Sequence, residues 1–236
     1  MFLDLNIKGQ DFDKNIEMAN PSKKYGWNHI NFSYNPNDFK EALKFKKELN
    51  SYFDGTITID YTLEFKPKNQ NELVKITKKF RDKCNCITIT GGDLKINRAC
   101  CENIKVDVLS RPYLKRFDSG LNHVLAKEAV NNNVAIELSF NDILNSYLSY
   151  RSKIIANFKD IYTLYRKFDF PLVLSSRSKS IFDIKSPYYL LYFFKSTGLS
   201  EDDCFKSQKT SQDILEFNKN RKNMILKGVR RIDNEA

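Results

Sequence analysis

Apolar positions along the chain alternate between short runs rich in Ile, Val and Thr and longer segments with helical spacing. The short runs predict strands at residues 2–5, 27–33, 56–61, 87–90, 105–109, 134–138 and 171–174, with a possible last strand at 224–232. The longer segments predict helices at residues 37–49, 70–83, 94–101, 120–131, 143–168, 187–195, 201–206 and 211–222, and a helix or an irregular crossover at 11–24.

Strands that alternate with helices, with no linker and no internal repeat, favour a closed barrel. We therefore predict an α/β fold, a TIM-like (β/α) barrel that forms a single domain over residues 1–236, with a basic helical part at about 187–236. An open doubly wound sheet is the alternative. Gly91-Gly92 is only a weak match to the phosphate-binding glycine fingerprint of that fold.

The stretch from Arg116 to Ser139 contains a helix with two distinct sides. The apolar side is made of Leu121, Val124, Leu125, Ala129 and Val130, and the polar side of His123, Lys127 and Glu128. Asp118 and Ser119 precede the helix, so we expect their oxygens to cap a start near Gly120. Asparagines at 131–133 are expected to end it, because short amides tolerate left-handed backbone.

Composition indicates a folded chain without membrane spans. The sequence is 41% hydrophobic and 13% aromatic, and no apolar run approaches the roughly 18–20 residues that a membrane helix needs. The N-terminus shows no basic segment followed by an apolar one, so we expect a cytoplasmic location. The five cysteines are odd in number and lack metal-site spacing, which favours buried, reduced thiols.

The charge pattern points to a polyanionic partner. The chain has 39 Lys and Arg against 29 Asp and Glu, a net charge of +10. Residues 151–236 contain 17 basic and 10 acidic side chains, so this last third has a net charge of +7. Such an excess attracts phosphate backbones by releasing condensed counterions. A lysine-rich solubilising surface is the alternative interpretation.

Polar residues follow the predicted strands at their carboxyl ends, where barrels bind ligands. They are Asp4, Asn6, Asn31, Ser33, Asp60, Thr90, Asp93, Asp107, Glu137, Ser139, Ser175 and Ser176. Clustered metals in barrel phosphoesterases use several histidines, whereas this chain has only His29 and His123. A carboxylate-only Mg²⁺ site stays open, but hydrogen-bonded or ion-paired carboxylates are the favoured interpretation. No catalytic motif occurs, so we predict no catalytic residue and no bound metal.

Basic residues on the predicted carboxyl-end loops suggest contacts with RNA phosphates. They are Lys95, Arg98, Arg111, Lys115, Arg116, Arg151, Arg177 and Lys179. Arginine's planar fork grips phosphate oxygens, and Tyr113, Tyr147 and Tyr150 offer faces on which bases could stack. This mixture suits RNA better than a small metabolite.

Three motifs resemble a known family. They are Val106-Asp107-Val108-Leu109-Ser110, Arg116-Phe117-Asp118-Ser119-Gly120-Leu121-Asn122-His123-Val124-Leu125-Ala126 and Val134-Ala135-Ile136-Glu137. Together with the later run Pro171-Leu172-Val173-Leu174-Ser175-Ser176, they are similar to the p30-type subunit, or protein component 3, of archaeal and eukaryotic ribonuclease P. The chain departs from that pattern at Arg177-Ser178, where small residues are expected.

The resemblance implies a barrel related to the metal-dependent PHP phosphoesterases but without their metal cluster. Asp4-Leu5-Asn6 stands where such enzymes would have paired histidines. It further implies a subunit of an RNA-based endonuclease that removes the 5′ leader of precursor tRNA. In such a particle the RNA catalyses with Mg²⁺, and the protein itself needs no cofactor.

The implied partners are the catalytic RNA, precursor tRNA, the component 2 protein, often as two copies of each, and the other protein subunits. His123 and Lys127 then join the predicted RNA contacts, because the polar helix side becomes an RNA-facing surface. The alternatives are a metallo-phosphoesterase acting alone, dependent on Asp60 or Glu137, and an RNA-binding module of another particle.

Overall fold

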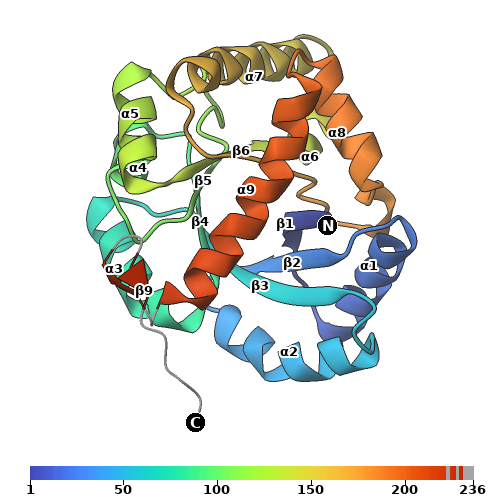
Figure 1. The fold of residues 1–236 in the computed structure, drawn as a ribbon. Coiled ribbons are helices and arrows are strands. Elements are labelled where there is room, and N and C mark those ends of the chain that lie inside the picture. The colour runs from blue at the N-terminus through green and yellow to red at the C-terminus, as the bar shows by residue number, and fades with distance from the viewer. Residues whose placement is uncertain (222–223, 227–228, 231–236) are drawn as a thin grey trace.

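A computed structural model describes residues 1–221, 224–226 and 229–230, the last two ranges by their backbone only. Seven parallel strands form one sheet in sequence order. They are β1 (Leu3–Lys8), β2 (His29–Tyr34), β3 (Thr58–Phe65), β4 (Cys86–Thr90), β5 (Val108–Ser110), β6 (Ala135–Ser139) and β7 (Leu172–Ser175). The sheet curves into a nearly closed TIM-like barrel (Figure 1). The predicted fold class is confirmed, and the doubly wound alternative is wrong because consecutive strands are neighbours throughout.

Helices surround the barrel and follow the strands in turn (Figure 1). They are α1 (Phe12–Lys24), α2 (Phe39–Tyr52), α3 (Gln70–Phe80), α4 (Leu94–Cys101), α5 (His123–Asn132), α6 (Phe140–Leu144), α7 (Leu148–Phe168), α8 (Pro187–Ser196) and α9 (Glu201–Lys219). Short 3₁₀ turns cover Arg81–Lys83 and Ile181–Asp183. None of the described helices combines the length and apolar character that crossing a bilayer requires.

Two helical boundaries differ from the sequence prediction. The helix predicted at 143–168 is two helices, because the chain turns at residues 145–147. The helices predicted at 201–206 and 211–222 are one continuous α9. Its buried face contains the polar residues Ser207, Gln208 and Ser211, which interrupt the apolar periodicity without interrupting the helix.

The last predicted strand, 224–232, is not part of the barrel. Met224–Leu226 (β8) and Val229–Arg230 (β9) form a separate antiparallel ribbon, and the remainder of that prediction lies outside the described residues. The predicted helical part from residue 187 is helical as far as Lys219.

Helix α9 crosses the amino-terminal mouth of the barrel (Figure 1). The backbone N–H of Leu3 donates to Gln208 at 2.9 Å, and Asn218 donates to Asp107 at 2.8 Å. Ile214 and Leu215 of α9 cluster with interior side chains from the strand starts, namely Leu3, Leu5, Cys86, Val108, Ala135 and Val173. This end of the barrel is therefore closed by apolar packing.

The start of α5 differs from its prediction. Asn122, not Asp118 or Ser119, caps the helix and accepts hydrogen bonds from the N–H groups of Val124 and Leu125, both at 3.0 Å. The expected end is confirmed, because Asn133 has left-handed backbone with φ of 55°. Part of the expected apolar side is exposed: Val124 and Val130 face outward while Leu121, Leu125 and Ala129 are buried.

The five cysteines are all free and buried, as predicted. Burial raises the pKa of the Cys84 thiol to about 12 and that of Cys101 likewise to about 12. These thiols are therefore un-ionised, and they pack as small apolar groups.

Candidate nucleic-acid interface

The carboxyl half of the barrel interior contains a buried ion cluster around Arg177. The Nη1 atom of Arg177 lies 2.6 Å from Glu64 Oε1 and 3.5 Å from Glu137 Oε2, and it donates to Ser110 Oγ at 3.2 Å. The side chain of Arg177 is 10% exposed. The guanidinium of Arg177, which we predicted to contact RNA phosphates, therefore lies inside the barrel against these two carboxylates.

The charges of this cluster stabilise one another. Burial opposes ionisation of Glu64, but the Arg177 guanidinium outweighs burial and lowers the pKa of Glu64 to about 2. Burial likewise opposes the charge on Arg177, and the two carboxylates outweigh it and raise the Arg177 pKa. A cation of the protein itself therefore neutralises Glu64 and Glu137. Among the described residues, no three His, Cys, Asp or Glu side chains are grouped to hold a metal.

Two of the carboxylates predicted at the carboxyl rim lie at the amino end instead. Asp60 is the third residue of β3, where it contacts Lys46 and lies 3.3 Å from Nε2 of His29. Asp107 precedes β5 and lies 2.6 Å from Nη1 of Arg81. Burial raises the pKa of Asp60, but the contacts with His29 and Lys46 outweigh it and hold the pKa below its ordinary value.

These positions bear on the metallo-phosphoesterase alternative. Asp60 and Glu137, the two residues on which it depends, lie at opposite ends of the barrel and bind different cations. The favoured interpretation of the acidic residues is confirmed, since each has ion-pair or hydrogen-bond partners. Asp93, for example, caps α4 by accepting from the N–H groups of Lys95 and Ile96.

Asp4 bridges the seam between the first and last strands. Its Oδ1 accepts from the N–H of Ser176 at 3.2 Å, and the N–H of Lys8 donates to the carbonyl of Ser178 at 2.8 Å. The other oxygen, Oδ2, is buried without a hydrogen-bond partner among the described residues. Burial is the largest cause that raises the pKa of Asp4 to about 7, against the hydrogen bonds that lower it.

This raised pKa predicts a pH dependence of stability. Between about pH 4 and 7 the folded state retains a proton on Asp4 that the unfolded chain has released. The contribution of the neutral Asp4 carboxyl to the free energy of unfolding is therefore fully present below about pH 4, and it is lost as the pH rises through 7. Asp4→Asn stays neutral throughout. Relative to the wild type it should gain about 2 kcal/mol in free energy of unfolding between pH 5 and pH 8. Urea denaturation at both pH values, with Asp160→Asn as an exposed control, tests this; parallel profiles for Asp4→Asn and the wild type would contradict it.

The long loop between β5 and α5, residues 111–122, forms a rigid part of the carboxyl rim. The Asn97 amide donates to the carbonyls of Pro112 and Gly120 at 3.0 and 2.8 Å, and its oxygen accepts from the N–H of Gly92. Gly120 has φ of 65°, and a Cβ there would lie 2.1 Å from the Pro112 carbonyl oxygen. The loop is therefore fixed to the preceding β4–α4 turn.

A second anchor joins this loop to α6. Tyr113 is buried, and its hydroxyl donates to Asp142 Oδ2 at 3.0 Å. Arg111 lies 3.3 Å from Oδ1 of the same carboxylate. The expectation that Tyr113 offers a stacking face is therefore wrong, and Arg111 is largely engaged inside the rim.

The remaining predicted RNA contacts lie at different places. Lys95, Lys115, Arg151 and Lys179 are exposed near the carboxyl ends of the strands, and none forms an ion pair with a described residue. Arg116 is held by Asp118 through Nε and Nη2, at 2.6 and 2.8 Å, and by the Gly92 carbonyl. Exposed His123 begins α5, while Lys127 and Arg98 lie further along their helices, Arg98 paired with Glu102 at 2.7 Å.

Exposed aromatic rings lie beside some of the basic residues at the carboxyl rim. Phe117 is 91% exposed and Tyr147 75% exposed, and Tyr150 is exposed as well. Lys153 lies over the Phe117 ring with its Nζ 3.4 Å from the centroid, and Arg151 lies 5.8 Å from the Tyr147 centroid. We call the following residues the rim patch: Lys115, Phe117, Tyr147, Tyr150, Arg151 and Lys153.

Sequence reasoning missed Phe117 and Lys153. Phe117 stands between Arg116 and Asp118 in the loop, and an apolar residue there is usually assigned to the core. Lys153 belongs to a long helix whose exposed side has many charges. The available signal was an aromatic residue inside a charged loop with no helical or strand periodicity around it.

Comparison with known proteins identifies the family. Residues 1–223 match the family described as RNase P subunit p30. The chain belongs to the ribonuclease P p30 subunit family. A p30 relative from Methanothermobacter thermautotrophicus, ribonuclease P protein component 3, is 35% identical over 97% of this chain and 94% of its own length. Component 3 of Methanocaldococcus jannaschii is 39% identical over 73% of this chain and 75% of its own.

Solved structures agree with the p30 assignment. A chain in the cryo-EM structure of archaeal ribonuclease P with mature tRNA superposes with a TM-score of 0.85 at 33% identity, covering 99% of both chains. The zinc-complexed histidinol phosphate phosphatase of Lactococcus lactis shares the fold alone, with a TM-score of 0.57, 11% identity and coverage of 84% of this chain and 94% of its own. The expected relation to a phosphoesterase barrel is confirmed at the level of the fold.

Proposed function

We propose that this p30 subunit promotes removal of the 5′ leader of precursor tRNA by binding and organising the catalytic RNA of ribonuclease P through its carboxyl rim. The observation that supports this most is the rim patch, where exposed rings lie on the 111–122 loop and on the start of α7, beside cations that form no ion pair with a described residue. Exposed apolar groups that lie together mark interaction sites, and exposed aromatic rings suit stacking with unpaired bases.

The chemistry belongs to the RNA in this proposal. Mg²⁺ is bound by the RNA subunit, and the protein contributes cations and stacking faces without a cofactor of its own. Glu64 and Glu137 inside the barrel are bound to Arg177, and we therefore assign the RNA contacts to the rim surface. We place the particle in the cytoplasm.

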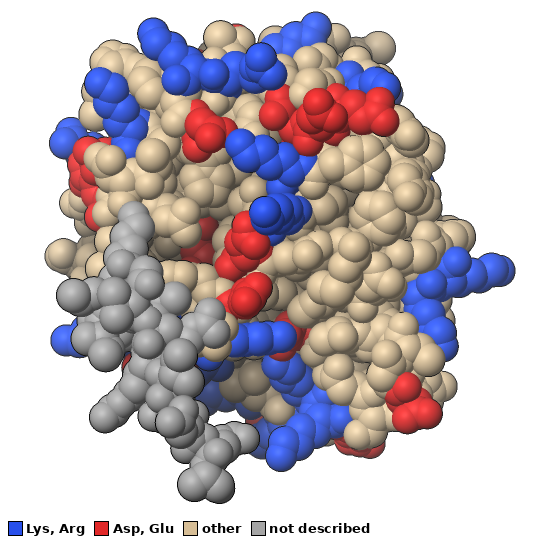
Figure 2. Space-filling view, viewed as in Figure 1, with Lys and Arg blue, Asp and Glu red and all other residues tan. Residues whose placement is uncertain are grey.

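The pairing with the component 2 protein is a further part of the proposal. Figure 2 looks onto the face that α9 crosses and shows basic and acidic side chains side by side there, next to a broad area without charged groups. Exposed rings of α8 and α9 include Tyr188, Tyr192 and Phe205, with the Tyr188 centroid 6.3 Å from each of the other two. We place component 2, as one or two copies, on these rings, since an uncharged aromatic surface suits a protein better than a phosphate backbone.

Reconstitution tests the function. The RNA subunit is assembled with the other protein subunits, with and without this chain, and cleavage of precursor tRNA is measured under single-turnover conditions. We expect a lower rate and weaker substrate affinity without the chain. Equal cleavage in both assemblies would contradict the proposal, and hydrolysis of a generic phosphodiester by the chain alone would favour the metallo-phosphoesterase alternative.

A further inference from the structure

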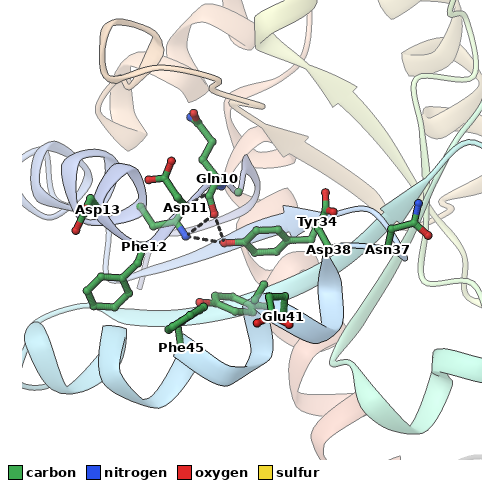
Figure 3. A pocket seen from close by; sticks show the side chains of 13 residues that line it. Gln10, Asp11, Phe12, Asp13, Tyr34, Asn37, Asp38, Glu41 and Phe45 are labelled. Carbon is green, nitrogen blue, oxygen red and sulfur yellow. Dashed lines mark hydrogen bonds between the residues drawn. The ribbon is translucent and has the colours of Figure 1, made fainter.

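A cavity of about 610 Å³ opens between the β1–α1 and β2–α2 loops, at the carboxyl side of the barrel. Aromatic rings form its walls: the centroids of Phe12 and Phe45 lie 6.0 Å apart, and those of Tyr34 and Tyr61 lie 5.1 Å apart. Figure 3 shows Tyr34 between Phe12 and Phe45 on one side and Asn37 and Asp38 on the other. The volume is in the range of pockets that enclose small organic ligands.

The polar lining of this cavity is acidic. Four carboxylates line it, and no Lys, Arg or His does; the four are Asp11, Asp13, Asp38 and Glu41. Asp11 pairs with Lys14 at 3.1 Å and Glu41 with Lys44 at 2.7 Å, both on the surface. Asp13 and Asp38 form no ion pair within the described part of the chain. On a protein with a net charge of +10, this is a local reversal of sign.

Hydrogen bonds hold the Tyr34 ring in a fixed position in the wall of the cavity. The hydroxyl of Tyr34 accepts from the Asn15 amide at 2.6 Å and donates to the Gln10 carbonyl at 3.2 Å (Figure 3). Gly9 allows this position, because a Cβ there would lie 2.4 Å from the Tyr34 ring. Tyr61 also lines the cavity, and Tyr34 is the one described residue whose side chain interacts with its buried hydroxyl.

We propose that this pocket binds an organic cation, an alkylammonium or alkylguanidinium group on an apolar stem. Its carboxylates attract the positive group, its aromatic faces hold the cation and the stem, and the Tyr61 hydroxyl, which otherwise meets only Tyr34, accepts a hydrogen bond from the ligand. The same carboxylates repel phosphate, so this site is separate from the RNA-binding rim patch. The cation comes either from a free polyamine or from a Lys or Arg side chain of another protein.

Ligand-observed NMR on the full chain separates the two sources. The probes are spermidine, Nα-acetyl-lysine N-methylamide, Nα-acetyl-arginine N-methylamide and, as the anionic control, Nα-acetyl-glutamate N-methylamide. We expect at least one cationic probe to bind with a dissociation constant below about 1 mM and the anionic probe not to bind. Binding of spermidine alone indicates a free polyamine, and binding of the capped amino acids alone indicates a protein side chain. Binding of both supports the shared chemistry.

Matched variants locate the binding. Asp38→Asn with Glu41→Gln removes two lining charges at exposed positions and should weaken binding at least tenfold. Glu17→Gln with Glu48→Gln removes the same charge from α1 and α2 outside the cavity and should leave binding unchanged. The proposal is overturned if no cationic probe binds at a concentration ten times the expected dissociation constant. It is also overturned if the probes bind equally well to both double variants.

Discussion

Replacing Arg177 with Met is expected to lower the free energy of unfolding by about 3–5 kcal/mol at pH 7, because it leaves Glu64 and Glu137 buried without their cation. Removing the guanidinium raises the pKa of Glu64, since burial is then opposed only by the weaker contributions of Arg111 and Lys8. A raised carboxyl pKa gives stability that is lost as the pH rises. The difference from the wild type should therefore be larger at pH 8 than at pH 5.

Urea denaturation at both pH values measures this effect. Lys179→Met, two residues away and exposed, is the matched control and should change the free energy of unfolding by less than about 0.5 kcal/mol. Adding Glu64→Gln to Arg177→Met should recover part of the loss, because one uncompensated charge is removed. If Arg177→Met were as stable as Lys179→Met at pH 8, the interior ion cluster would not have the role assigned to it.

The second large effect concerns RNA affinity. Changing Lys115, Arg151 and Lys153 together to Gln removes three cations of the rim patch and retains most of each side-chain stem. If each contacts one phosphate, the slope of log affinity against log salt falls by about 2–3, and the affinity for the catalytic RNA falls on the order of 100-fold at 0.15 M salt. Filter binding across a salt series gives both quantities.

The control keeps the total charge change constant. Lys47, Lys75 and Lys78 are exposed on α2 and α3, away from the rim patch, and their triple change to Gln lowers the net charge by the same amount. We expect a loss of less than about threefold, which reflects the long-range field only. Similar slopes for the two triple variants would show that RNA binding depends on net charge and not on the rim patch.

Periodicity in the sequence was enough to predict the barrel but not the length of each strand. The third strand was expected at 56–61, which placed Asp60 at its carboxyl end; β3 continues to Phe65. Within this continuation, Glu64 interrupts the apolar pattern. Glu64 is tolerated inside the barrel only because it meets Arg177, a partner distant in sequence, and no local pattern reveals that pairing.

Candidate site residues were predicted least well where side-chain direction decides their role. Arg177 and Lys179 are two residues apart in one basic loop, yet the first is directed inward and the second outward. Tyr113 and Phe117 show the same contrast, since the hydroxyl of Tyr113 finds Asp142 inside the rim and Phe117 has no such anchor. Residue type indicated RNA as the partner, but only the fold shows which side chains can reach it.

Ultraviolet crosslinking of the assembled particle, followed by mass spectrometry of the crosslinked peptides, tests the central claim most directly. Crosslinks form where a side chain touches a base, and Phe117, Tyr147 and Tyr150 are the rings that the rim patch exposes. We predict that the main crosslinks to the catalytic RNA or precursor tRNA lie at these three residues. Crosslinks confined to α2, α3 or the face that α9 crosses would contradict it.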